Sequence, residues 1–273
     1  MPCARLAVLL ALSGAPILLS TGCADPASER FVQPAVASCD DSVDVEAANA
    51  GLLRVVTWNI KTAALASLDT IAELLASFDA DVIALQEVDR LTERSGRADQ
   101  AAELAELLGM EHSFAAALEQ SRGEYGIALL SRFAFARAER IELPRAGGFQ
   151  PRVAIDADLC AGGEQPLRVL ALHADVFPWA AAAQTRFVAR LAAETVGNGV
   201  VVTGDFNQTP EAEGLRALGD VPLFDVSPQD VGTSDLSRHI DYLFVDEALT
   251  PEDGRVYDSD SSDHDPVIAD LQR

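Results

Sequence analysis

Three polar clusters in the last quarter of the chain each lie beside an apolar, strand-like run: Gly204-Asp205-Phe206-Asn207, His239-Ile240-Asp241-Tyr242 and Ser262-Asp263-His264-Asp265-Pro266. Burying Asp, Asn or His beside such a run costs several kcal/mol unless the group is paired or binds a metal. Two clusters upstream, Thr57-Trp58-Asn59-Ile60 and Leu85-Gln86-Glu87-Val88, follow the same arrangement. The five clusters together predict one assembled active site.

Two of these clusters carry oxygen donors suited to metal or phosphate chemistry. Asp205 and Asn207 are two residues apart, so in an extended chain both side chains project from the same face. Gly204, just before them, permits an unusual backbone angle or a close approach. Glu87 and Asn59 each follow an apolar run, where carboxylate and amide oxygens suit a hard cation such as Mg²⁺. For each cluster taken singly, a polar turn at the end of a strand is the structural alternative.

A second kind of chemistry comes from an acid and a base. Asp241 lies inside an apolar run, and a buried Asp of this kind is usually paired. Asp263-His264 supplies a histidine, and an Asp–His pair fixes the imidazole tautomer and raises its basicity, as a base that activates water requires. His173 ends the run Leu170-Ala171-Leu172, from which it could donate to a phosphate oxygen.

The elements that must position these residues are mostly short strands. The apolar patterns predict strands over 52–58, 81–86, 127–130, 138–143, 152–159, 167–172, 200–203, 240–245 and 267–271, and helices over 68–78, 100–108, 179–196 and 212–218. Gly109 is a good stop for the second helix. Several strands follow one another directly, which argues against a simple alternating βαβ sheet and favours two packed sheets with helices outside.

Composition narrows the class of protein. The chain has 273 residues, 49% of them hydrophobic, which is enough for one large globular domain. Its formal net charge is −23, whereas a tight, sequence-independent nucleic-acid binder normally shows a basic footprint. This charge favours a smaller phosphorylated substrate, although a local metal site could still let a nuclease neutralise phosphate.

The N-terminus is typical of an exported protein. Residues 1–22 are predicted to be a signal peptide, because residues 6–19 are apolar but too short to span a bilayer. Leu19-Ser20-Thr21-Gly22-Cys23 resembles the lipobox of bacterial lipoproteins, which implies lipidation of Cys23 and anchoring to a bacterial membrane on its periplasmic or outer face. Ser20 stands where that motif usually has leucine, so ordinary signal cleavage and secretion is the alternative.

Residues 23–50 are acidic and lack periodicity, so they are predicted to be a flexible tether before a catalytic domain over 51–273. Cys3 falls in the signal peptide. Cys39 and Cys160 remain as an even pair in an oxidising compartment, where they could form a disulfide or stay as two thiols.

The ordered motifs resemble those of the endonuclease/exonuclease/phosphatase superfamily, which includes DNase I. The resemblance rests on Thr57-Trp58-Asn59-Ile60, Leu85-Gln86-Glu87-Val88-Asp89, Leu172-His173, Gly204-Asp205-Phe206-Asn207, Ile240-Asp241-Tyr242 and Ser262-Asp263-His264. It runs from about Leu53 to Leu271. It implies an α/β fold, a DNase I-like four-layer α/β/β/α sandwich with two central mixed sheets, and hydrolysis of a phosphate ester assisted by Mg²⁺ or Mn²⁺.

For the metal, the resemblance implies that Glu87 is the principal ligand, with Asn59 and Asp263 nearby. Many relatives carry a His-Gly pair soon after the Asn-Ile pair, whereas this chain reads Lys61-Thr62-Ala63-Ala64, and Ile127 stands where many have Asn. These departures concern the substrate more than the catalysis. Lys61 is the only lysine in the chain, and we draw no function from that count.

For the reaction, the resemblance implies that Asp205 orients or deprotonates the attacking water and that Asn207 holds the phosphate. His264, oriented by Asp241, would be the second member of the acid–base machinery. His173 would contact phosphate or assist the leaving group.

The expected function is therefore an exported, metal-dependent phosphoesterase acting on phosphodiesters or phosphomonoesters. A nuclease or a sphingomyelinase-like phospholipase of the same fold is the alternative, although the sequence shows no exposed aromatic hairpin for inserting into a membrane. A binding module on an inactive hydrolase fold is a further alternative, against which the presence of Glu87, Asp205 and His264 argues. No obligate protein partner is predicted. Candidate phosphate contacts, or ordinary surface ion pairs, are Arg122, Arg152 and Arg238.

Overall fold

The computed structural model describes residues 31–32, 39, 52–162 and 165–273 of the protein. The predicted signal peptide, Cys23 and most of the predicted tether lie outside the described residues. Within the described ranges, no helix combines the length and the apolar character that crossing a membrane requires.

Among the described residues, seven strands form the first sheet, in the order β1-β4-β5-β3-β2-β13-β12. Their bounds are Phe31–Val32 (β1), Glu111–Gln120 (β4), Gly123–Ser131 (β5), Val82–Arg90 (β3), Leu52–Asn59 (β2), Val267–Gln272 (β13) and Thr250–Val256 (β12). β2 and β3 run parallel, and the other neighbouring pairs are antiparallel. The first sheet is therefore mixed.

The second sheet, in the same part of the chain, has six strands in the order β10-β11-β9-β8-β7-β6. Their bounds are Leu223–Asp225 (β10), Asp241–Asp246 (β11), Val200–Asp205 (β9), Leu167–His173 (β8), Val153–Leu159 (β7) and Phe135–Glu142 (β6). Only β8 and β9 run parallel here. Each sheet thus contains one parallel pair, and both pairs carry predicted site residues at their carboxyl ends.

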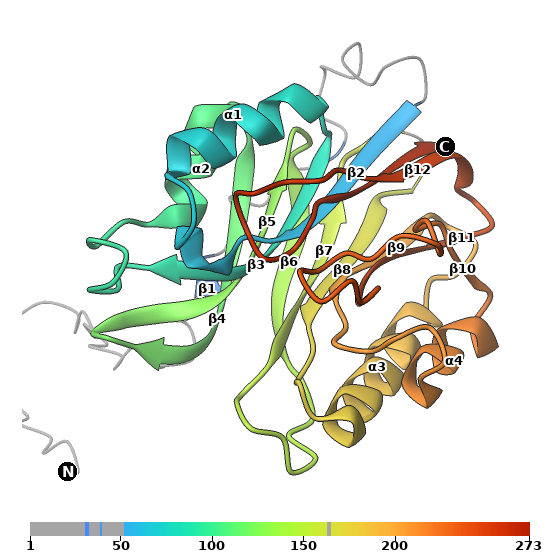
Figure 1. Cartoon of the computed structure of the whole chain (residues 1–273). Coiled ribbons are helices and arrows are strands. Elements are labelled where there is room, and N and C mark those ends of the chain that lie inside the picture. Colours follow the sequence, from blue (N-terminus) through green and yellow to red (C-terminus); the bar gives the residue numbers. More distant parts are fainter. Residues whose placement is uncertain (1–30, 33–38, 40–51, 163–164) are drawn as a thin grey trace, which may run out of the picture.

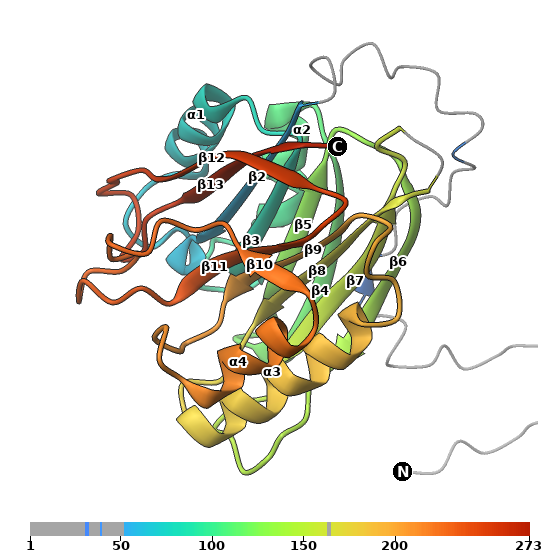
Figure 2. The same ribbon diagram turned by 90° about the vertical axis from the view of Figure 1, so that its right-hand side faces the viewer.

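Helices cover the outer face of each sheet, as Figures 1 and 2 show. α1 (Leu68–Phe78) and α2 (Gln100–Leu108) lie on the first sheet, whereas α3 (Pro178–Ala192) and α4 (Glu213–Asp220) lie on the second. The α2 bounds agree with the prediction, and Gly109 ends that helix in the left-handed conformation. The four layers confirm the predicted sandwich with two central mixed sheets.

The alternation of apolar side chains along the strands separates three cores. Val55 and Val201 point between the two sheets and belong to a central core. Val56, one residue on, packs with α1 and α2, and Val202 packs with α3 and α4. Because side chains of a strand alternate between faces, a strand buried on both faces needs a continuous apolar run, as the valines of β9 provide.

Several elements differ from the sequence prediction: the short strands β1 and β10 were not predicted, and three longer elements differ as well. β4 and β12 were not predicted: β4 contains an alanine-rich run with no strand preference, and β12 is a largely exposed edge strand containing Pro and Gly. α3 ends at Ala192, four residues before the predicted end.

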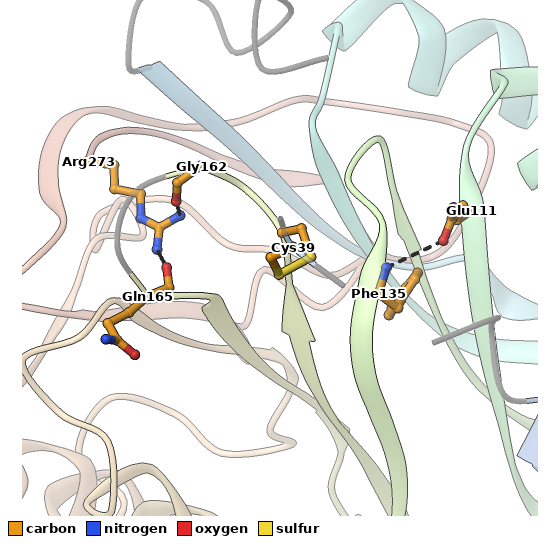
Figure 3. The surroundings of a disulfide bond; sticks show 7 residues. Cys39, Glu111, Phe135, Gly162, Gln165 and Arg273 are labelled. Carbon is orange, nitrogen blue, oxygen red and sulfur yellow. Dashed lines mark hydrogen bonds between the residues drawn. A yellow bond between two sulfur atoms is a disulfide. The ribbon is translucent and has the colours of Figure 1, made fainter. Parts of the chain in front are cut away.

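The N-terminal segment contacts the domain at two described points. Phe31 and Val32 pair with β4 at the edge of the first sheet. Cys39 forms a disulfide with Cys160, 121 residues further on (Figure 3). Of the two possibilities left open by the sequence, a disulfide or two thiols, the structure has the disulfide. Part of the segment predicted as a tether is therefore attached to the domain.

Candidate active site

The sandwich brings the predicted site residues to one edge, where the two parallel strand pairs end. Asn59 is the last residue of β2, His173 the last of β8 and Asp205 the last of β9. Asp241 was expected within a strand, but it is the first residue of β11, where it pairs with Asp205. Since β11 runs antiparallel to β9, its first residue lies at the same edge as the last residue of β9.

Asp205 contacts site residues from both sheets. Its Oδ2 accepts from Asn59 Nδ2 at 3.2 Å and lies 3.4 Å from His173 Nε2. Its Oδ1 accepts from the backbone N–H of Asn207 at 2.9 Å. Gly204 makes this arrangement possible, because a Cβ there would lie 1.9 Å from the carbonyl oxygen of Leu172.

Glu87 reaches the site through a bulge and does not end its strand as expected. β3 continues to Arg90, and its register with β5 shifts between Gln86 and Val88. Glu87 itself has a φ of 55°, and bulges of this kind turn a side chain in a new direction. Its Oε1 accepts from Asn59 Nδ2 at 3.3 Å, so one amide nitrogen faces two carboxylates.

Asp241 and His264 form a hydrogen-bonded pair, with His264 Nδ1 2.9 Å from Asp241 Oδ2. Thr233 holds the carboxylate from the other side: its hydroxyl donates to the same oxygen at 2.6 Å and accepts from the backbone N–H of Asp241 at 3.1 Å. Trp58 Nε1 donates to the carbonyl oxygen of His264 at 2.7 Å, which fixes the loop carrying the imidazole.

The pKa values of His264 and of the neighbouring Asp205 are both raised. Burial disfavours a charged His264, but Asp241 and Asp205 outweigh it and raise the pKa of His264 to about 9. His264 is therefore protonated at neutral pH. Burial, together with the charge of Asp241, raises the pKa of Asp205 to about 7, while His264 opposes that rise.

His173 behaves in the opposite way. Burial, followed by the charges of Arg152 and His264, lowers the pKa of His173 well below its ordinary value, so its imidazole is neutral. Arg152 Nη1 lies 3.0 Å from His173 Nδ1. The same Nη1 lies 3.2 Å from His173 Nε2, so Arg152 alone does not set the tautomer. Nε2 also faces Asp205 Oδ2 at 3.4 Å, and a carboxylate there favours the proton on Nε2.

Asn207 has a φ of 51°, a conformation that asparagine tolerates better than most residues. Its Nδ2 donates to the carbonyl oxygen of Ala174 at 3.1 Å. The amide nitrogen is thus already bonded to the backbone, which fixes the orientation of the side chain. The role expected for Asn207, holding the phosphate, would be played by an amide in this orientation.

Asp263 lies at the same edge but is paired with a residue that sequence reasoning passed over. The ammonium of Lys61 is 2.7 Å from Asp263 Oδ2. The hydrogen bond from Lys61 and the charge of His264 outweigh burial and hold the pKa of Asp263 below its usual value. Asp263 is therefore an ionised carboxylate that already has a cation beside it.

Of the three arginines considered as phosphate contacts, only Arg152 lies at the site. Arg122 is exposed on the turn between β4 and β5, where it pairs with Glu93 at 2.9 Å beside a hollow of about 710 Å³ that none of the predicted catalytic or metal residues line. Arg238 is exposed as well, and its carbonyl oxygen accepts from the backbone N–H and hydroxyl of Thr233. Arg122 thus forms the surface ion pair that the sequence analysis gave as its alternative, whereas Arg152 is buried.

A hollow of about 370 Å³ opens beside Glu87 and Arg152. Its wall contains a cation, Arg94, and a half-buried phenol, Tyr125, whose pKa is raised by desolvation and by the charge of Glu87. Its other lining residues are Leu118, Gln120, Phe149, Gln150 and Val176. A hollow of this size, with cations beside the carboxylates, fits a small molecule that carries a phosphate.

Exposed aromatic side chains gather at the rim of this hollow. Phe149 and Trp179 are 68% and 58% exposed, and Phe177 lies between them, stacked on Trp179 with ring centroids 4.9 Å apart. Phe149 lies in the loop before β7, and Phe177 and Trp179 lie at the start of α3. Because the three residues do not belong to one hairpin, the sequence did not indicate the cluster.

The donor set fits a divalent cation. Glu87 and Asp205 converge on a single amide nitrogen, and two carboxylates held together in this way repel each other unless a cation offsets them. Oxygen donors of this kind suit Mg²⁺ or Mn²⁺. Among the described residues, the acidic and histidine side chains whose ligand atoms lie within 4.8 Å of one another are Asp205, Asp241 and His264. His264 is protonated there and bonded to Asp241, which favours an acid–base role for it.

Comparison with known proteins defines the class. The model of the Endonuclease/Exonuclease/phosphatase family matches residues 56–264, so the chain belongs to this family of phosphoester hydrolases. No curated protein sequence matches the chain.

Solved structures share the fold at low sequence identity. An endonuclease/exonuclease/phosphatase from Beutenbergia cavernae is 23% identical, with a TM-score of 0.66 over 81% of this chain and 71% of the other. The mannosyl-6-phosphatase of Bacteroides thetaiotaomicron is 17% identical, with a TM-score of 0.65 over 81% and 100%. The human Nocturnin catalytic domain, solved with a bound sulfate anion, is 20% identical, with a TM-score of 0.66 over 81% and 94%.

Proposed function

We propose that this protein is an exported phosphoesterase that uses Mg²⁺ or Mn²⁺ to hydrolyse a phosphate mono- or diester by attack of water. The observation that carries the proposal is the convergence on Asp205 of Asn59, His173 and His264 from both sheets. A buried carboxylate among protein donors, next to a second carboxylate, is a costly arrangement that a purely structural role does not require.

The chain's own residues supply the proton chemistry. Asp205, with its pKa raised to about 7, can accept a proton from water at neutral pH while its backbone and amide donors hold it in place. Protonated His264, oriented by Asp241, supplies a positive charge and a proton to the phosphate or the leaving oxygen. Neutral His173 presents an N–H, and Arg152 places a fixed positive charge behind it.

The metal would be held by Glu87, with Asn59 and Asp263 nearby. When bound, it would supply positive charge that offsets the charge developing on the phosphate oxygens.

The hollow favours a small phosphorylated substrate. Arg152 and Arg94 place two guanidinium groups along its wall, and Phe149 adds an apolar surface for the part of the substrate that is not phosphate. The chain's net charge of −23 disfavours long nucleic acid, whose backbone would be repelled outside the site.

One observation keeps a phospholipase as the second candidate. The exposed cluster of Phe149, Phe177 and Trp179 at the rim of the hollow resembles the surfaces that contact lipid. Hydrolysis of sphingomyelin in vesicles would favour it over a soluble substrate.

Export and lipidation of Cys23 are part of the proposal. The disulfide between Cys39 and Cys160 supports an oxidising compartment, where such bonds persist. Changing Cys23 to Ala should release the protein from membranes, and continued fractionation with membranes would contradict lipid anchoring.

The test of the activity compares p-nitrophenyl phosphate, bis-p-nitrophenyl phosphate, plasmid DNA and sphingomyelin, each with Mg²⁺, Mn²⁺ or EDTA. The Glu87→Gln variant should lose metal-dependent turnover by about 10²-fold or more. Glu73→Gln, at an exposed glutamate of α1, is the matched control and should keep full activity. Turnover that persists in EDTA and in Glu87→Gln would refute the metal-dependent reaction.

Inactivity towards all four compounds, together with tight binding of one of them, would instead favour the binding-module alternative.

A further inference from the structure

The only lysine of the chain lies beside a carboxylate that the site would otherwise offer to a metal. Lys61 Nζ is 2.7 Å from Asp263 Oδ2. The hydrogen bond and charge of Asp263 raise the pKa of Lys61, and the charges of Asp235 and Glu87 add to that rise. Arginine provides every other basic side chain in the protein, so a compact ammonium occurs at this position alone.

The backbone holds Lys61 in an unusual conformation. Lys61, Thr62 and Ala63 have φ values of 47°, 55° and 56°, and each such residue other than glycine costs about 1–2 kcal/mol. Conformations of this kind persist only where the surrounding structure enforces them, and they gather at functional sites.

Hydrogen bonds from the site itself enforce this turn. Asn59 Oδ1 accepts from the backbone N–H of Lys61 at 3.1 Å, and Gln100 Nε2 donates to the carbonyl oxygen of Thr62 at 2.8 Å. The residue that faces Glu87 and Asp205 with its amide nitrogen therefore also positions the lysine with its amide oxygen.

The loop that carries Asp263 is held just as firmly. Ser262 donates through its hydroxyl to the carbonyl oxygen of Asn59 at 2.6 Å, and the backbone N–H of Asp235 donates to the carbonyl oxygen of Asp263 at 2.8 Å. Both partners of the ion pair are thus fixed by the chain around them.

We propose that the ammonium of Lys61 takes the place of a second divalent cation at Asp263, so that the site binds a single metal ion, at Glu87. The inference rests on the proposed function. A lysine is a point charge that the chain cannot lose by dissociation, whereas Asp263 without it would be a carboxylate open to a metal ion. One positive charge is therefore built into the site, and only the other must be recruited from solution.

The experiment counts bound Mn²⁺ by the electron paramagnetic resonance signal of the free ion, without any substrate. The protein should bind one ion. Lys61→Met removes the charge while keeping much of the stem, and should raise the count to two. Lys61→Arg restores a cation and should return it to one, and the double variant Lys61→Met/Asp263→Asn should also bind one.

Each outcome separates the inference from the function on which it depends. If the protein binds one ion and Lys61→Met also binds one with unchanged affinity, Lys61 does not stand in for a cation, and only the inference fails. Two ions in the unmodified protein would overturn it as well. No bound Mn²⁺ at all would refute the metal-dependent function and the inference together. Circular dichroism melts of each variant show that the counts refer to folded protein.

Discussion

Each end of strand β8 lies in a buried cluster of ionisable groups, and the two clusters differ in how their charges are balanced. Arg168, near the start of β8, makes two hydrogen bonds to Asp156, and Arg137 adds another. His173, at the other end, faces Asp205, beside which Asp241 and Glu87 also lie. Cations match carboxylates at the first end, whereas carboxylates outnumber them at the second.

The two buried aspartates titrate in opposite directions as a result. Burial raises the pKa of Asp156, but the hydrogen bonds from Arg168 and Arg137 outweigh it and hold the pKa below its ordinary value. Burial and the charge of Asp241 raise the pKa of Asp205 and outweigh the opposing effects of His264, Asn207 and Asn59. One sheet thus contains a cluster that stabilises the fold and a cluster that is costly until a ligand or metal arrives.

The largest expected effect is a loss of turnover on changing Asp205, which a change of Asp156 should not cause. Asp205→Asn should lower turnover by about 10²–10⁴-fold, because the amide cannot accept a proton from water. Its melting temperature in EDTA should stay equal to that of the unchanged protein or rise, since a costly buried carboxylate has gone. Asp156→Asn should keep the specific activity of the folded protein. Equal losses of activity in both variants would remove the distinction.

The second prediction concerns stability at the paired end. Asp156→Asn leaves Arg168 without its buried partner and should lower the free energy of unfolding by about 3–5 kcal/mol in urea titrations. Asp158→Asn is the matched control, because Asp158 also pairs with Arg137 but is 28% exposed, and it should cost less than about 1 kcal/mol. Similar losses of unfolding free energy in the two variants would mean that burial does not determine how much each carboxylate stabilises the fold.

The smallest effect is a difference in the pH dependence of stability, measured as melting temperature in EDTA. The pKa of Asp205 is raised on folding, so its contribution is greatest at low pH and falls as the pH rises from about 4 to about 7. The pKa of Asp156 is lowered, so its contribution is present above about pH 4 and falls as the pH drops through the folded pKa.

Asp205→Asn should therefore flatten the decline in melting temperature towards neutral pH, and Asp156→Asn should flatten the decline at acid pH. His264, with its pKa raised to about 9, adds a separate decline above about pH 6.5 in both proteins. If the melting temperature of Asp205→Asn declined towards neutral pH as steeply as that of the unchanged protein, the pKa of Asp205 would not be raised on folding.

Sequence patterns predicted the elements whose signals are local. The prediction of α2 needed only its periodic apolar residues and Gly109, both of which act within a few residues of the helix. β4 could not be predicted, because the run Phe114-Ala115-Ala116-Ala117 becomes a strand through pairing with β5 on one side and β1 on the other. β12 lacks the alternation of a half-buried strand because it lies at an edge.

The contacts of the site also divide into those that the sequence predicted and those that it could not predict. Polar residues after apolar runs predicted that Asn59, Glu87 and Asp205 would meet, since burying such groups is costly unless they pair or bind a metal. The contact of Lys61 with Asp263 depends on a left-handed turn for which Lys and Thr carry no signal. Thr233 lies in an aperiodic loop, and only the folded chain shows that its hydroxyl holds Asp241.

The disulfide has a consequence for where a lipid-anchored form of the protein would work. Cys160 follows β7 at the end where Leu159 pairs with Leu167, the first residue of β8. His173 lies six residues further along β8, about 20 Å away. Figure 3 shows the bond among the loops of this far end, where Arg273 holds the carbonyl oxygens of Gly162 and Gln165.

Phe31, the first described attachment, follows Cys23 by only eight residues, which span at most about 28 Å when fully extended. A lipid on Cys23 would therefore keep the domain close to the bilayer. Phe31 pairs with Ala115, which is level with Ile127, Gln86 and Asn59 across the first sheet. The tether would thus reach the domain at the level of the site, whereas the disulfide holds the same segment at the far end.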